Sequence, residues 1–385
     1  MTQLLADEHT IVERILHHID HNTTDLSDGI WREPVENYVS PARFSAEIRQ
    51  VLRRAPTAFC PSAALPEAGS YLARDAALTP IVAMRGNDGV VRAFRNACRH
   101  RGVQLVDGTG CKQALTCRYH AWTYGLDGAL RGIPDAHGFP DLEKDAYGLV
   151  PLKTVEKHGI VFVTQDSAEA DQSERDFLPE LFPSDLRLYS STQQEFEANW
   201  KIVAEGFLEG YHIRSTHHDT FYPLQYDNLN VIEAFGRNSR ISFPYRRIEK
   251  LRNVPPAERS TTGMLTHVYH LFPNVMIATF PTNMIMTVLE PLTVSRTRLV
   301  TYTLSNMAGR EDGRTAIAQG RDFVTAGAAE DREMACAAQR GLASGANESF
   351  VFGLFEGAIR HFHRNLDAAI RERQSLDRMH AASDA

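Results

Sequence analysis

The sequence has little cysteine, no clustered positive charge and no long apolar run. Its 385 residues include only 5 cysteines, an odd and sparse set that does not suggest a disulfide framework. The formal net charge of -7 and the lack of any dense Lys/Arg block argue against a polyanion-binding surface, so we expect no nucleic-acid partner. No apolar stretch approaches the roughly 18 residues that a membrane span needs, so we expect no membrane partner either.

The first residues, MTQLLADEHT, lack the basic start and the long apolar core of a signal peptide. Together with the few cysteines, this predicts a cytoplasmic protein, in which cysteine favours a metal or redox role. The length exceeds the roughly 100 to 200 residues of one domain, so we expect two.

Local patterns divide the chain into three segments. Apolar residues from Ile11 to Ile19 recur at helical spacing, so residues 1–41 are predicted to be a helical segment that packs on the C-terminal domain. Residues 42–163 show short alternating runs punctuated by Gly, Asp and Asn, which predicts an all-β domain. One of its hairpins is expected to turn at Gly86–Gly89.

The polar stretch Thr164–Arg175 marks the expected boundary, and residues 165–385 form the second predicted domain. We expect it to begin with a helix over Asn199–Arg214, where apolar residues recur at spacings of four. Strands are expected at Asn230–Phe235, His267–Leu271, Val275–Phe280, Met284–Glu290 and Thr297–Leu304, and closing helices at Thr315–Leu342 and Phe355–Arg373.

Two cysteines and two histidines form the first candidate metal site. Cys98 and His100 are two residues apart, Cys117 and His120 three apart, and each pair lies at a strand end. Such a set can bind tetrahedral zinc or a 2Fe-2S cluster with cysteines on one iron and histidines on the other. Structural zinc sites more often group like ligands, so the mixed pairs favour the cluster. Cys111 lies outside both pairs and is interpreted as a free side chain.

A second candidate site lies on the helix expected at Asn199–Arg214. Glu205, Glu209 and His212 follow at spacings of four and three, which would place all three on one side of a helix. His217 is about 140 degrees away from His212 on a regular helix, so both can face one iron only if the helix breaks between Ile213 and Thr216. The competing local ligand is His218. Nearby aromatic side chains could line a pocket for an aromatic ring or a cationic headgroup: Tyr211, Phe221, Tyr222 and Tyr226.

A distant carboxylate could complete this site. Asp331 precedes Met334, Ala335 and Ala338 by three, four and seven residues, so it is expected to share an apolar, buried face of a helix. A buried carboxylate needs a compensating cation, and two histidines with one carboxylate are the ligands of non-heme iron. Glu330 is the alternative ligand, and a solvated acidic pair near a helix start is the alternative without metal.

These motifs carry a family resemblance. FRNACRHRG (94–102) with CRYHAW (117–122) resembles the cluster-binding signature of Rieske-type non-heme iron oxygenase α subunits, the aromatic ring-hydroxylating oxygenase family, with Ala121 where glycine is usual. The stretches NWK (199–201), EGYH (209–212) and EDREMACAAQRGL (330–342) resemble the mononuclear iron segments of the same family. The resemblance assigns one cluster iron to Cys98 and Cys117 and the other to His100 and His120, the mononuclear iron to His212, His217 and Asp331, and a catalytic bridging role to Glu209.

The resemblance implies an α+β protein, with an all-β Rieske domain and a helix-grip-type catalytic domain whose antiparallel sheet is covered by helices. It implies a terminal oxygenase that uses O2, with electrons from NADH or NADPH through a reductase or ferredoxin, to hydroxylate or dealkylate a small organic substrate, foremost an aromatic compound. Glu209, where ring-dihydroxylating members often carry aspartate, favours the alternative of a quaternary ammonium substrate such as carnitine.

The resemblance also implies a homotrimer in which Glu209 links the cluster of one subunit to the iron of the next. It leaves open a small β subunit and the choice between mono- and dioxygenation. An iron-sulfur electron carrier or a zinc-organised binding module, without oxygen chemistry, is the alternative of another class.

Overall fold

The computed structural model describes residues 5–166, 178–307 and 313–383. The described residues of Arg53–Asp171 and Leu178–Ser184 form a smaller compact unit, and those of Met1–Leu52 and Asp185–Ala385 form a larger one. Most of the polar stretch Thr164–Arg175, where we expected a boundary, lies outside the described residues.

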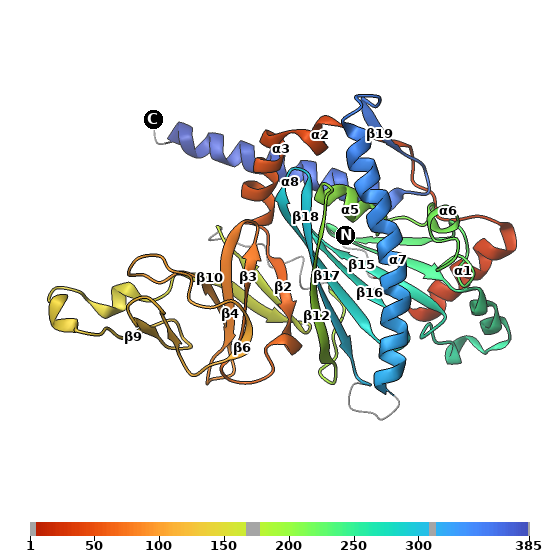
Figure 1. The fold of residues 1–385 in the computed structure, drawn as a ribbon. Coiled ribbons are helices and arrows are strands. Elements are labelled where there is room, and N and C mark those ends of the chain that lie inside the picture. The colour runs from red at the N-terminus through yellow and green to blue at the C-terminus, as the bar shows by residue number, and fades with distance from the viewer. Residues whose placement is uncertain (1–4, 167–177, 308–312, 384–385) are drawn as a thin grey trace. The chain divides into compact units, whose positions relative to one another are not determined.

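The smaller unit consists of antiparallel sheets (Figure 1). The predicted hairpin around Gly86–Gly89 is confirmed, because the two strands that flank it pair with each other. The larger sheet has, in spatial order, β2 (Thr57–Pro61), β11 (Ile160–Thr164), β10 (Pro151–Lys157), β5 (Val91–Arg95), β4 (Thr79–Arg85), β3 (Ser70–Ala76) and β6 (Gly108–Cys111). The other has β7 (Leu115–Thr116), β8 (Thr123–Tyr124) and β9 (Leu130–Gly132).

The larger unit is built on a seven-stranded antiparallel sheet. Each of the five strands expected in this domain is found, with boundaries shifted by a few residues. In spatial order the strands are β12 (Arg187–Phe196), β18 (Arg296–Ser305), β17 (Met284–Thr293), β16 (Val275–Thr279), β15 (Leu265–Leu271), β14 (Asn238–Pro244) and β13 (Val231–Phe235). A separate pair joins β1 (Trp31–Pro34) to β19 (Ser349–Phe352).

Helices cover this sheet. The longest, α7 (Gly313–Leu342), runs across one face of it in Figure 1. Buried side chains of α5 (Trp200–Gly206) and α8 (Gly357–Ser383) share one hydrophobic core with the strands. The remaining helices are α1 (Glu8–His21), α2 (Glu36–Val39), α3 (Pro41–Ala46) and α6 (Ile213–Thr216).

The N-terminal helix α1 belongs to the larger unit. Its side chains Ile11, Val12, Ile15 and Leu16 are buried in a core with residues of the sheet and its loops, such as Val231. The apolar residues that recur at helical spacing in the sequence therefore form the face of α1 that packs on the rest of the unit.

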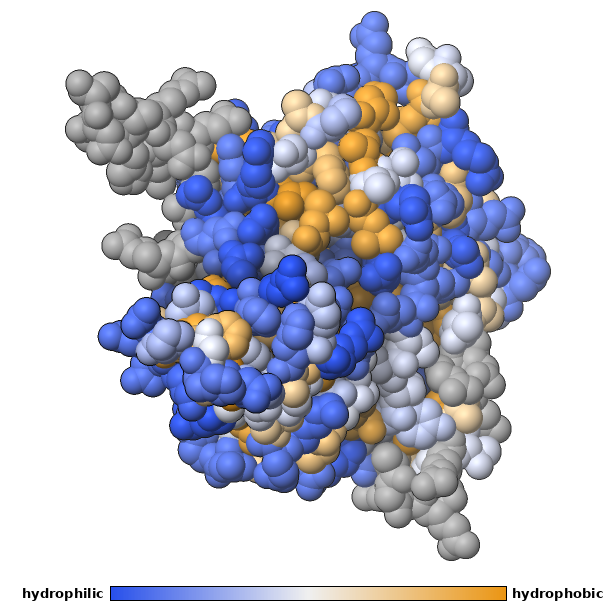
Figure 2. All heavy atoms as spheres, turned by 60° about the vertical axis from the view of Figure 1, so that its left-hand side comes forward, coloured by the Kyte–Doolittle hydropathy of each residue, from blue (hydrophilic) through white to orange (hydrophobic). Residues whose placement is uncertain are grey.

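Hydrophilic side chains cover most of the molecular face in Figure 2, and hydrophobic ones gather in one area in its upper part. Among the described residues, none of the helices combines the length and the apolar character that crossing a bilayer requires. An exposed apolar area of this kind often marks a contact surface.

Candidate functional site

The helix expected at Asn199–Arg214, which carries candidate ligands of the mononuclear iron, is shorter than expected. α5 ends at Gly206, and the prediction that it continues to Arg214 is wrong. The carboxylate of Glu209 accepts hydrogen bonds from the backbone N–H groups of Tyr211 and His212, which satisfies donors just before α6 begins. The break therefore lies before His212. The prediction of a break between Ile213 and Thr216 is wrong, because these residues form α6.

Glu205 does not join Glu209 and His212, so the expected shared helix face is wrong. The buried Glu205 carboxylate accepts hydrogen bonds from Tyr38 Oη at 2.6 Å and lies 2.8 Å from Nε2 of the buried His363. This polar contact in the core comes from residues without a recognisable motif, so no sequence pattern indicates it.

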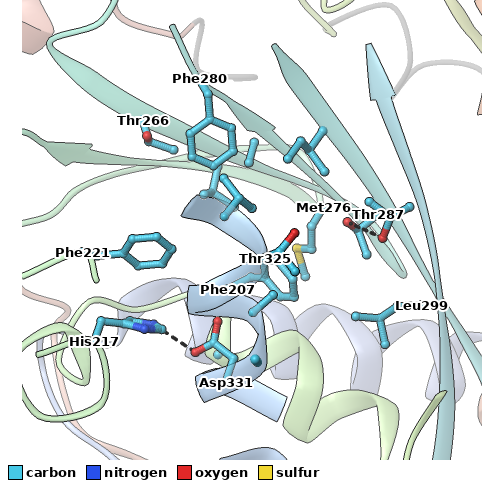
Figure 3. A pocket seen from close by; sticks show the side chains of 18 of the residues that line it. Phe207, His217, Phe221, Thr266, Met276, Phe280, Thr287, Leu299, Thr325 and Asp331 are labelled. Atoms are coloured by element: carbon cyan, nitrogen blue, oxygen red, sulfur yellow. Dashed lines mark hydrogen bonds and ion pairs between the residues drawn. The ribbon is translucent and has the colours of Figure 1, made fainter. Parts of the chain in front are cut away.

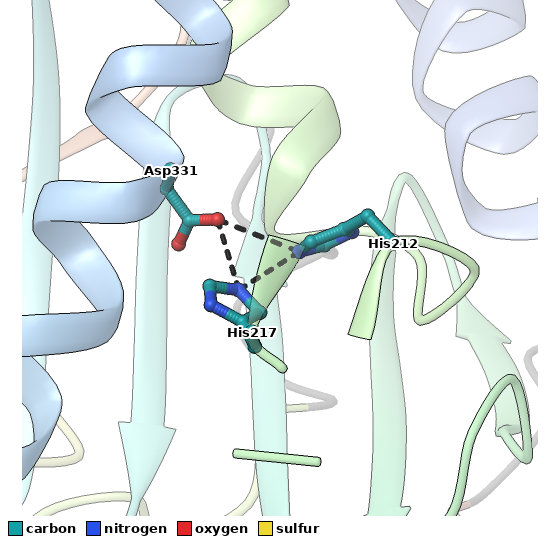
Figure 4. A group of neighbouring side chains, drawn as sticks. All are labelled: His212, His217 and Asp331. Atoms are coloured by element: carbon teal, nitrogen blue, oxygen red, sulfur yellow. Dashed lines mark hydrogen bonds and ion pairs between the residues drawn. The ribbon is translucent and has the colours of Figure 1, made fainter. Parts of the chain in front are cut away.

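Three candidate ligands converge on one point (Figure 4). His212 Nε2 and His217 Nε2 lie 3.1 Å apart, and Asp331 Oδ1 lies 3.4 Å from the first and 3.0 Å from the second. Two imidazole nitrogens and one carboxylate oxygen around a common centre are the ligand type and geometry of a non-heme iron site with open coordination positions. The donor set therefore fits a single ferrous ion.

The electrostatics of this point favour a cation. Burial alone would lower the pKa of His212, but hydrogen bonds to Asp331 and Glu209 raise it to about 10. Burial would raise the pKa of Asp331, but the hydrogen bonds to His212 and His217 lower it below its ordinary value. The carboxylates thus hold a positive charge between them, which is a proton when no metal ion is bound.

Glu330 and Asp331 face different atoms of the same histidine. Glu330 Oε2 lies 2.7 Å from His217 Nδ1 and accepts a hydrogen bond from Thr220 Oγ1 at 2.7 Å, whereas Asp331 faces Nε2. Glu330 therefore orients the ring from its outer side. His218, the other competitor, points away and pairs with Asp219.

The buried helix face expected around Asp331 is only partly correct. Ala335 is buried, but Met334 is 46% exposed and Ala338 is also exposed. The carboxylate is held by the two histidines rather than by apolar burial, so only the tertiary contact explains its position.

The four candidate cluster ligands lie in two loops of the smaller unit with the same backbone pattern. In each loop the cysteine carbonyl accepts a hydrogen bond from the residue four positions later, and the cysteine N–H donates to the residue five positions later. The four bonds are Gly102 N to Cys98 O, Cys98 N to Val103 O, Ala121 N to Cys117 O and Cys117 N to Trp122 O.

The side chains of these loops fit a metal cluster. Cys98 and Cys117 are buried, and the rings of His100 and His120 lie 4.6 Å apart between centroids. His100 Nδ1 is buried without a hydrogen-bond partner within the part of the chain that the structure describes. A buried nitrogen of this kind is costly unless a ligand compensates it, and a metal ion would do so. Trp122 stacks on the His100 ring, so it would border a cluster held by this histidine.

Comparisons with known proteins decide the family. Residues 55–152 match the Rieske [2Fe-2S] domain, and residues 183–372 match the ring hydroxylating alpha subunit (catalytic domain). The carnitine monooxygenase oxygenase subunit of Acinetobacter pittii is 30% identical over 338 residues, which cover 82% of this chain and 86% of that protein. The chain belongs to the Rieske oxygenase α subunits.

Two further similarities extend over nearly the whole of this Rieske oxygenase. The carnitine monooxygenase oxygenase subunit of Escherichia coli K12 is 28% identical over 371 residues, which cover 89% of this chain and 94% of that protein. A crystal structure of a quaternary ammonium Rieske monooxygenase covers 96% of this chain and 99% of its own, with a TM-score of 0.77 at 22% identity. The expected fold class, the Rieske cluster with mononuclear iron, and the terminal oxygenase function are thereby confirmed.

The Rieske oxygenase has a cavity of about 590 Å³ beside the three converging side chains (Figure 3). Phe207, Phe221 and Phe280 point into it together with residues of α7 and the sheet. Among the aromatic residues suggested by the sequence, Phe221 lines this cavity, but Tyr211 is 60% exposed and packs in a tilted arrangement against Phe355. Phe280 comes from a distant segment of the chain, so no local pattern could have grouped it with the residues around His212.

Proposed function

We propose that this Rieske oxygenase monooxygenates a quaternary ammonium compound, the alternative that Glu209 suggested. The cavity carries this proposal. Its lining includes the carboxylates of Glu209 and Asp331 and five phenylalanines, and no lysine or arginine is among the described residues that line it. Acidic groups and phenyl faces attract a cationic headgroup. The two related carnitine monooxygenase subunits support the same substrate class.

We propose that His212, His217 and Asp331 hold the mononuclear iron and that Cys98, His100, Cys117 and His120 hold the 2Fe-2S cluster. When bound, the ferrous ion supplies the oxygen-activating chemistry. The residues of this chain orient and shield the site. Glu330 and Glu209 fix the two histidine rings through Nδ1. The Phe221 ring, whose centroid is 4.5 Å from that of His217, excludes water on one side.

We further propose a homotrimer that receives electrons from NADH or NADPH through a reductase or ferredoxin, with Glu209 as the link between subunits. Exposed apolar side chains support a contact beside this residue. The backbone N–H of Tyr211 donates a hydrogen bond to Glu209, and the Tyr211 ring packs in a tilted arrangement against Phe355. The adjoining Leu354 is 39% exposed. Exposed aromatic and aliphatic groups of this kind are typical of subunit contacts. A small β subunit stays an open alternative, and a cytoplasmic location stays a prediction.

The test is oxygen uptake by the reconstituted holoenzyme with a reductase, against a set of quaternary ammonium compounds and a set of aromatic acids and hydrocarbons. We expect substrate-dependent uptake and one product molecule per O2 with the ammonium set, and none with Asp331→Asn. Each turnover would combine the substrate, O2, two electrons and two protons to give the hydroxylated product and water. Turnover of the aromatic set alone would refute the proposed substrate class.

A further inference from the structure

Three threonines stand in a row across the sheet that walls the cavity. Thr192 of β12 pairs directly with Thr301 of β18, which pairs directly with Thr287 of β17. In the next register position on the same face, Ser190 pairs with Thr303. All five line the cavity, because residues two apart on a strand point to the same side. We call Thr192, Thr301 and Thr287 the threonine row.

The threonine row runs from an exposed to a buried position of the cavity wall. Thr192 lies on the edge strand β12 and is exposed, whereas Thr287 is buried. Beside the row, the cavity wall also carries apolar side chains, with Leu299 and Ile285 at the adjoining positions of β18 and β17. Burying a hydroxyl group in an apolar cavity lowers the stability of the protein unless the hydroxyl is hydrogen-bonded. Threonine is therefore a poor choice for packing alone.

The row keeps hydrogen-bonding capacity toward the cavity. Thr287 Oγ1 and Thr301 Oγ1 lie 3.4 Å apart, so one can donate weakly to the other. A hydroxyl has one donor and two acceptor sites, so this contact leaves most of the capacity of the pair unused. Thr266, on another part of the same cavity wall, instead bonds Tyr245 Oη at 2.8 Å.

We propose that the threonine row binds an uncharged hydroxyl group of the substrate, so that this site takes an ammonium compound whose tail is an alcohol. The substrate class rests on the proposed function above. Hydroxyl partners suit a neutral alcohol, which both donates and accepts. A carboxylate tail would need a cation to offset its loss of hydration, and the described lining residues offer none. The cavity volume of about 590 Å³ leaves room for the rest of a substrate in addition to its trimethylammonium group.

The experiment compares matched compounds that differ in one group. Trimethylammonium compounds with a terminal hydroxyl, a terminal methyl or a carboxylate on the same chain are titrated into the holoenzyme by calorimetry and assayed for kcat/KM. We expect the alcohol to be favoured about tenfold or more over the methyl compound, because a site that binds a hydroxyl rejects the analogue without it. In Thr301→Val and Thr287→Val, the ratio of alcohol to methyl compound should fall to about two or less. Because the Thr266 hydroxyl already has a partner, Thr266→Val should retain the wild-type ratio.

The result that overturns the proposal is equal binding of alcohol and methyl compounds, preference for the carboxylate, or a ratio unchanged in both threonine variants. A parallel pair of aromatic compounds with and without a terminal hydroxyl separates the proposal on the threonine row from the proposal of an ammonium substrate. If only the aromatic pair binds, and its ratio depends on Thr301, the threonine row is supported and the ammonium substrate is refuted. If no hydroxylated compound of either set binds, the threonine row is refuted.

Discussion

Glu330 Oε2 lies 2.7 Å from His217 Nδ1, on the side of the ring opposite Asp331. This contact holds the imidazole so that Nε2 faces the proposed iron position. A carboxylate behind a ligating histidine also strengthens its basicity. Two adjacent acids of α7 thus have different tasks, since one faces the metal position and the other faces the ligand.

The first prediction concerns these two acids. Glu330→Gln should weaken iron binding about 10- to 100-fold, because the loss of an outer carboxylate usually has this effect. Asp331→Asn should leave no detectable iron after gel filtration. Competition with a chelator measures both, and the exposed Glu333→Gln is the matched control on the same helix. Equal iron affinity in Glu330→Gln and wild type would contradict the orienting role.

The second prediction concerns Glu209. Because its carboxylate bonds His212 Nδ1, alanine would disturb the iron ligand as well as the proposed link between subunits. Glu209→Gln keeps an oxygen acceptor and removes the charge. We expect the cluster to stay bound and iron binding to weaken about 10- to 100-fold, as in Glu330→Gln. At saturating iron, turnover should fall at least about 100-fold, with slow cluster oxidation in a stopped-flow single turnover. Exposed Glu258→Gln serves as control. Near-normal turnover in Glu209→Gln would refute the link.

The third prediction concerns Ala121, which has a φ of +57° at the position where Gly102 has +74° in the other cluster loop. A side chain in this left-handed conformation costs about 1 kcal/mol relative to glycine. Ala121→Gly should therefore stabilise the smaller unit by about that amount, measured by thermal unfolding. Gly102→Ala should have the opposite effect through φ alone, since its added Cβ meets no atom within 4 Å. Destabilisation by Ala121→Gly would contradict this explanation.

The fourth prediction concerns the reduction potential of the cluster. The Tyr124 hydroxyl accepts a hydrogen bond from Arg99 N at 2.9 Å and lies 3.3 Å from Cys98 Sγ, to which it can donate. Burial raises the pKa of Tyr124, so its proton is retained. A donor to the ligand sulfur stabilises the more negative reduced state. Tyr124→Phe should lower the potential by about 40 mV, equivalent to about 1 kcal/mol. Redox titration measures it, with Tyr147→Phe as control.

The fifth prediction concerns stability at low pH. His270 is fully buried, and burial lowers its pKa from 6.5 to about 4. Between these values the unfolded chain binds more protons than the folded one, so His270 should reduce stability as pH falls through this window. The loss approaches about 3 kcal/mol at pH 4. His270→Gln, which can still donate to Pro273 O, should flatten this dependence in denaturant unfolding. The exposed His9→Gln should not, and an unchanged slope in His270→Gln would contradict the assignment.

Local pattern was sufficient to predict several elements and to single out most candidate ligands of the two proposed metal sites. Helical spacing of Ile11, Val12 and Ile15 predicted the packed face of α1, and turn residues at 86–89 predicted a hairpin, because each signal depends on neighbours in the chain. The motifs around Cys98 and His212 also predicted the chemistry, because ligand type and short spacing restrict which metals can bind.

The tertiary structure decided what depends on residues far apart in sequence. The helix was expected to pass through Glu209, but α5 ends at Gly206, and the Glu209 carboxylate accepts hydrogen bonds from the backbone N–H groups of Tyr211 and His212. Glu330 and Asp331 are adjacent and chemically alike, so spacing could not distinguish them, whereas their contacts with opposite nitrogens of His217 do. The threonine row arises from strand register, which places Thr192, Thr301 and Thr287 side by side although about a hundred residues separate the first from the others.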